Sequence, residues 1–137
     1  MTAFVSLSAP ARELHNQLSA LSNWQDIYRT VILASRQQPP LADEYCTPAY
    51  QVDGCEARVW LKANHSDTAV HFEFASQSRM IFALTYASLL PLQEQTPLFA
   101  RQFDIEGWLQ ECNLVRHLAP SRSNGVYQII RAARASL

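Results

Sequence analysis

The chain has little glycine, only three residues in 137, and it contains no internal repeat and no low-complexity stretch. Glycine-rich and repetitive segments are the usual signs of a linker or a repeat array, so neither is expected here. We therefore predict a single domain over residues 1–137. At this length roughly two-thirds of the surface of the unfolded chain can be buried, which allows a hydrophobic core without disulfides or metal.

Long apolar runs and clusters of one charge are also absent. No apolar stretch approaches the ~20 residues that a membrane-spanning helix requires, and the first residues lack the apolar region of a signal peptide. The 11 basic and 12 acidic side chains give a formal net charge of −1, with no basic run. This balance removes the electrostatic basis for nucleic-acid binding. We expect a cytoplasmic protein that binds neither membranes nor nucleic acid.

The three cysteines, Cys46, Cys55 and Cys112, are odd in number and form no C-x-x-C pair. At least one thiol must therefore lack an intramolecular partner. A metal site that uses all three cysteines with one histidine remains an alternative, although no ligand pair is close in sequence. A serine hydrolase has no support, because the sequence contains no G-x-S-x-G motif.

Hydropathy patterns divide the chain into helical and extended parts. Leucines at helical spacing follow Pro10, and Ser22 begins a capping-box pattern before a second helix that Pro39 and Pro40 end. Residues 50–74 alternate between apolar and polar, which is typical of antiparallel strands with one buried face. The remainder is helical, with Ser121 as the expected cap of the last helix. We predict an α+β fold: a helical hairpin and C-terminal helices on one face of a small antiparallel sheet of about three strands.

Cys55 directly follows the Asp53-Gly54 pair, a strong turn signal between two predicted strands. A free cysteine is mostly protonated at neutral pH, and turn N–H groups or a nearby guanidinium favour its reactive thiolate. Arg58 and Arg122 are the candidates for that guanidinium. The alternative interpretation is that Cys55 is a small buried apolar residue, which is common for free cysteine.

Three segments resemble the SufE/CsdE family of cysteine-desulfuration proteins. VDGCEARVWL at residues 52–61 resembles the family's Gly-Cys motif, WQDIYRTVIL at 24–33 resembles its second helix, and LAPSRSNGV at 118–126 resembles its terminal Ser-Arg-x-x-Gly motif. Two segments differ: the family's acidic Asp-Ser-Glu is replaced by residues 75–79, ASQSR, and its Lys/Arg-Gly-Leu by Phe82-Ala83-Leu84. These differences predict an altered choice of partner, because charge complementarity governs recognition.

The resemblance implies a sulfur relay and a fold similar to IscU-type scaffold proteins. Cys55 would take sulfur from the persulfide of a SufS- or CsdA-like cysteine desulfurase, stimulate that enzyme, and pass the sulfur toward iron–sulfur cluster assembly or another acceptor. Arg122 matches the family's arginine near the C-terminal helix, Arg58 matches the basic residue inside the Gly-Cys motif, and Asp53, Gly54 and Glu56 complete the loop. The pyridoxal phosphate belongs to the desulfurase, so no cofactor or metal is expected on this chain, which would act as an accessory, as a monomer or a weak homodimer.

Exposure to water is a problem for such a relay, because thiolates and persulfides are readily oxidised or reduced. We expect Cys55 to be partly covered in the free protein, and the turn from Asp53 to Glu56 to swing outward when the desulfurase docks. Two alternatives stay open at this point. One is an IscU-like scaffold or zinc protein that uses Cys46, Cys55 and Cys112, and the other is a regulator that docks on a desulfurase without chemistry of its own.

Overall fold

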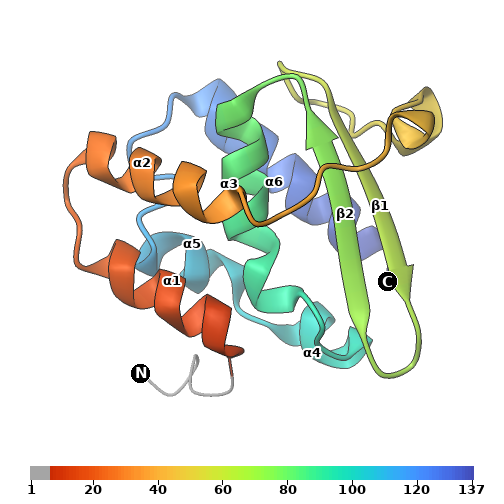
Figure 1. Ribbon diagram of the computed structural model, residues 1–137, viewed down its shortest axis with the longest axis horizontal. Coiled ribbons are helices and arrows are strands. Elements are labelled where there is room, and N and C mark those ends of the chain that lie inside the picture. Colours follow the sequence, from red (N-terminus) through yellow and green to blue (C-terminus); the bar gives the residue numbers. More distant parts are fainter. Residues whose placement is uncertain (1–6) are drawn as a thin grey trace.

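The computed structural model describes residues 7–137, and it begins with two antiparallel helices (Figure 1). Helices α1 (Ala9–Ser19) and α2 (Trp24–Ser35) form the predicted hairpin, with their buried residues at helical spacing. The expected cap at Ser22 is wrong. Asn23 caps α2, because its extended backbone lets its side-chain oxygen accept the free N–H of Asp26.

Within residues 7–137 the sheet has two strands rather than about three. Strands β1 (Val59–His65) and β2 (Val70–Ser76) pair antiparallel along their whole length. The expected first strand is reduced to a single bridge between Gln51 and Trp60, followed by one hydrogen bond from Val52 N to Val59 O at 2.8 Å. The segment before it is the 3-10 helix at Pro48–Tyr50, whose proline carries no N–H and so cannot extend the ladder.

The chain after β2 is helical, as predicted. The last helix carries no side-chain cap, so the prediction for Ser121 is wrong; the residue lies one position inside that helix, after Pro120. None of the helices in residues 7–137 is long and apolar enough to span a membrane. The remaining helical segments are η2 (Asp43–Tyr45), α3 (Arg79–Leu89), η4 (Leu90–Leu92), α4 (Pro97–Gln102), α5 (Ile105–Glu111) and α6 (Pro120–Ala135).

Helices α3 and α6 lie against one face of the β1–β2 hairpin, and α2 packs against α3 (Figure 1). Helix α3 is the centre of the core, and every residue from 83 to 89 is buried. Phe72 and Phe74 of β2, Trp108 of α5 and Ile129 of α6 complete this core and are all at most 1 % exposed. The α+β class and the packing of helices on one sheet face are therefore confirmed.

This packing brings three chain segments to one end of the hairpin (Figure 1). The loop before β1, the turn from β2 into α3, and the first turns of α6 all lie there. Any site built around that loop must therefore draw side chains from α3 and α6.

Candidate functional site

Cys55 lies in a tight turn that packs against helix α6. Gly54 has a φ of +88°, a left-handed conformation that glycine adopts without strain, as the Asp53-Gly54 turn signal predicts. A Cβ atom on Gly54 would lie 3.1 Å from Cγ of Gln128, so the turn and α6 approach closely. The Cys55 thiol donates a weak hydrogen bond to the carbonyl oxygen of Gly125 across 3.7 Å.

A cavity of about 310 Å³ opens beside the thiol. Its lining combines the Cys55 loop with the start of α3 and the first turns of α6, and includes Cys55, Glu56, Ser78, Ile81, Arg122 and Gly125. Gly125 is buried, and a Cβ placed on it would lie 3.9 Å from the Cys55 sulfur. The site therefore has room for a small group next to the sulfur atom.

The surroundings of Cys55 favour the neutral thiol. Partial burial raises the pKa of Cys55, and the nearby Asp53 carboxylate raises it further. The carbonyl of Gly125 acts in the same direction, because an oxygen acceptor can pair with an S–H but repels a thiolate. At neutral pH the free protein therefore holds this cysteine in its protonated, weakly nucleophilic form.

The two predicted arginines differ in their positions. Arg122 lines the cavity, and its Nη1 lies 3.3 Å from Sδ of Met80, while the side chain stays exposed. Arg58 does not line it: its guanidinium makes no hydrogen bond or ion pair with any residue of 7–137, and only its carbonyl is used, by Ser76 and Gln77. The structure brings Arg122 to Cys55 and leaves Arg58 outside the cavity.

Cys46 and Cys112 are in different environments. Cys112 is the C-cap residue of helix α5 and has no exposed surface, and burial strongly raises its pKa. Cys46 follows η2, where its thiol contacts backbone carbonyls of Leu41 and Ala42. All three cysteines are free, and within residues 7–137 no three His, Cys, Asp or Glu side chains converge as metal ligands would. The geometry thus gives no support to a scaffold or zinc site that uses these three thiols.

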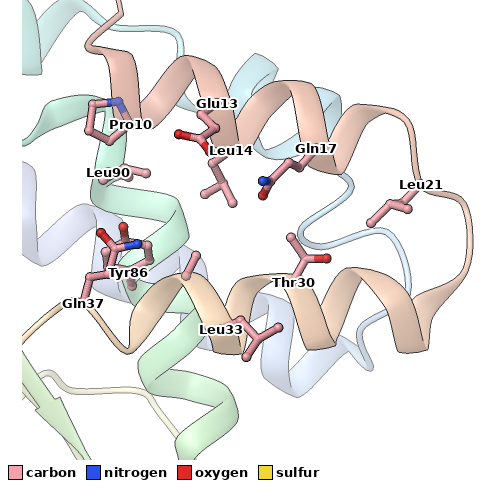
Figure 2. Close-up of a pocket in the computed structure, with 11 residues that line it drawn as sticks. Pro10, Glu13, Leu14, Gln17, Leu21, Thr30, Leu33, Gln37, Tyr86 and Leu90 are labelled. Carbon is pink, nitrogen blue, oxygen red and sulfur yellow. The ribbon is translucent and has the colours of Figure 1, made fainter.

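A larger cavity lies elsewhere, between α1 and α2 and next to α3 (Figure 2). It measures about 630 Å³, and Leu14, Leu21, Leu33 and Tyr86 line it together with polar side chains. Among residues 7–137, its lining includes no cysteine and no basic residue. This cavity therefore offers neither a nucleophile nor a cation that sulfur chemistry would use.

Sequence reasoning did not assign five of the cavity's lining residues to the site: Ala57, Ser78, Ile81, Ser121 and Gly125. Gly125 belongs to the segment LAPSRSNGV, so the sequence contained a signal for it. The sequence marks Ser78 only as a candidate helix cap. It has this role, since its side-chain oxygen accepts a hydrogen bond from Ile81 N at the start of α3. That Ser78 and Ile81 face the cysteine depends on how α3 packs.

Comparison with known proteins agrees with this arrangement. One similar solved structure, the solution structure of a hypothetical protein from Thermus thermophilus, has a TM-score of 0.75 over 95% of this chain and 94% of that chain. At 13% sequence identity the likeness shows a shared fold only. The family model described as "SufE: Fe-S metabolism associated domain" matches residues 12–137. Since that match covers nearly the whole chain and includes the cysteine loop and α6, the chain belongs to the SufE family of proteins associated with Fe–S metabolism.

Proposed function

We propose that this protein is a sulfur acceptor: Cys55 takes persulfide sulfur from a cysteine desulfurase and passes it toward iron–sulfur cluster assembly or another sulfur acceptor. The observation that carries the proposal is the Cys55 thiol on a left-handed turn, beside a cavity of about 310 Å³ that Arg122 lines. Membership of a family associated with Fe–S metabolism supports the same role. In this role the chain also stimulates the desulfurase, because it removes the sulfur that occupies the enzyme's cysteine.

The proposed step is a thiol exchange. The Cys55 thiol loses its proton, and the thiolate attacks the outer sulfur of the donor's persulfide. A new S–S bond forms on Cys55, the S–S bond of the donor breaks, and the donor cysteine leaves as its own thiolate, which a proton can neutralise. Sulfane sulfur moves without net oxidation or reduction, so the step requires no redox cofactor on this chain. The pyridoxal phosphate acts earlier, on the desulfurase, when sulfur is released from the cysteine substrate.

Activation of Cys55 is proposed to accompany docking. In the free protein the raised pKa and the Gly125 contact keep the thiol protonated. Moving the turn from Asp53 to Glu56 away from α6 would expose the sulfur, end that contact and restore a more ordinary pKa. Arg122, already at the cavity, would then favour the thiolate by its positive charge.

Mass spectrometry tests the proposal. The protein is incubated with a cysteine desulfurase, pyridoxal phosphate and L-cysteine, and digested without reductant. We expect a mass increase of about 32 Da, one sulfur atom, on the peptide that contains Cys55. Cys55→Ser should lose both this increase and the stimulation of the desulfurase, while Cys46→Ser and Cys112→Ser should keep both. Stimulation that survives in Cys55→Ser would instead identify a regulator that only docks.

A further inference from the structure

A second cleft lies next to the Cys55 cavity, between the end of α2 and the start of α3. Its volume is about 450 Å³. Two arginines, Arg36 and Arg79, line it, and Ile32, Pro40 and Phe82 provide apolar walls. Within the described part of the chain, no acidic residue belongs to the lining. The proposed sulfur relay leaves this cleft without a role.

The charges of the two arginines are not neutralised within the described residues. The ion pairs among residues 7–137 are His15–Glu111 and His71–Glu94, and neither involves Arg36 or Arg79. Both side chains are exposed. Two like charges at one cleft repel each other, and an anion between them would remove that repulsion.

The sequence accounts for the absence of Asp and Glu from the described lining of this cleft. No Asp or Glu occurs between Asp26 and Asp43, a stretch that includes most of α2, and none occurs between Glu73 and Glu94, a stretch that includes all of α3. Arg79 is also the first residue of α3, where the helix dipole favours negative charge. A cation in this position is electrostatically unfavourable unless an external anion accompanies it.

The cleft and the Cys55 cavity are lined by different residues of one chain segment. Ser78 and Ile81 line the Cys55 cavity, while Ser76, Arg79 and Phe82 of the same segment line the cleft. A protein surface that covers both sides of this segment would contact the Cys55 site and the cleft together. Because the walls include Phe82 and Ile32, the complementary group is a carboxylate beside an apolar side chain rather than a free small anion.

We infer that the cleft between Arg36 and Arg79 is a second docking point for the desulfurase, and that it takes an acidic side chain flanked by an apolar one. The inference rests on the proposed function, since it assumes that the partner is the protein that loads Cys55. Bidentate pairing between guanidinium and carboxylate groups supplies orientation as well as attraction. The cleft would thereby align the partner's persulfide with Cys55.

Charge reversal tests this docking point. The double variant Arg36→Glu/Arg79→Glu is compared with Arg12→Glu/Arg101→Glu, which makes the same charge change at exposed positions on α1 and α4. Binding to the desulfurase is measured by calorimetry at low and at high salt. We expect the cleft variant to raise Kd by at least about tenfold at low salt, and by less at high salt. The control variant should change Kd by less than about twofold.

Each other outcome has a distinct meaning. An equal loss in both double variants would overturn the inference, because net charge rather than this cleft would then govern binding. Unchanged binding by the cleft variant would overturn the docking point and leave the sulfur-acceptor role intact. Failure of the unmodified protein to bind any desulfurase and to gain sulfur on Cys55 would overturn both. Circular dichroism and the rate of Cys55 alkylation in the absence of partner verify that the variants keep the native fold.

Discussion

The thiol of Cys55 donates to the carbonyl oxygen of Gly125 on helix α6, 70 residues further along the chain. This contact joins the cysteine turn to the helix that also carries Arg122. Because a carbonyl oxygen stabilises the S–H form only, the same contact that holds the turn against α6 also keeps the cysteine unreactive. Position and reactivity of the sulfur are thus governed by one interface.

The pKa of Cys55 should be measurable through alkylation. Burial and the Asp53 carboxylate both raise that pKa, so less thiolate is present at any pH below it than in an ordinary cysteine. We expect the rate of reaction with iodoacetamide to rise with pH, with a midpoint above the ~8.5 of a free cysteine. The measurement uses a Cys46→Ser background, because Cys46 is the other cysteine with exposed surface.

Asp53→Asn separates the two causes of that shift. Removing the carboxylate should lower the midpoint and leave the larger contribution from burial in place. Glu56→Gln is the matched control, since it removes a charge from the same loop that is not among the causes of the shift. A midpoint at or below that of a free cysteine in the unmodified protein would contradict the environment described for Cys55.

Gly54 should resist substitution. Its φ of +88° is strained for any residue with a side chain, and a Cβ would also lie 3.1 Å from Gln128. We expect Gly54→Ala to lower the free energy of unfolding by about 1–2 kcal/mol, measured by urea denaturation. Gly54→Asn should cost less, because asparagine tolerates left-handed backbone better than alanine. Equal stability of Gly54→Ala and the unmodified protein would mean that the turn has another conformation in solution.

Gly125→Ala should have opposite effects on stability and on function. A Cβ at this position makes ordinary contact, at 3.9 Å from the Cys55 sulfur, and alanine is favoured over glycine inside a helix by up to ~1 kcal/mol. We expect unchanged or increased stability. The added methyl group narrows the space beside the thiol, so sulfur uptake in a single turnover should slow. Uptake at the normal rate would show that the second sulfur atom does not occupy this side of the cavity.

Arg122→Ala should affect chemistry more than folding. The side chain is exposed, and the hydrogen bond found for it is to Sδ of Met80, so we expect the free energy of unfolding to change by less than about 0.5 kcal/mol. Persulfide formation on Cys55 should slow by about tenfold, the effect of losing one charge interaction near 1.4 kcal/mol. Arg58→Ala, which removes a side chain outside the cavity, serves as the comparison. A larger effect from Arg58 than from Arg122 would reverse their assignment.

Docking should change how accessible Cys55 is. We expect a desulfurase whose own cysteine is replaced by serine to accelerate alkylation of Cys55, because movement of the turn away from α6 exposes the sulfur and lowers its pKa. The Cys46 thiol, which lies in a separate loop, reports any general change in reactivity. Equal alkylation rates of Cys55 with and without the partner would rule out this gating.

Local signals in the sequence predicted local structure well. The alternation in residues 50–74 predicted strands, of which β1 and β2 are present, and Asp53-Gly54 predicted a turn that is present with a positive φ at glycine. The caps at Ser22 and Ser121 were wrong by one or two positions, because several neighbouring residues can begin a helix and packing selects among them. The prediction of a third strand was wrong as well. The backbone at Gln51 forms a single bridge to Trp60, and Pro48 just before it has no N–H with which to extend the pairing.

The sequence alone determined that the chain is an α+β protein with an unpaired cysteine on a glycine turn, and its motifs indicated the family. Backbone preferences and hydropathy periods are properties of neighbouring residues, and they are readable without coordinates. Only the tertiary structure decided that Gly125 and Arg122 line the cavity beside Cys55 while Arg58 does not, and that Arg36 and Arg79 share a cleft. Those relationships join residues far apart in the chain, and they depend on how α2, α3 and α6 pack around a common core.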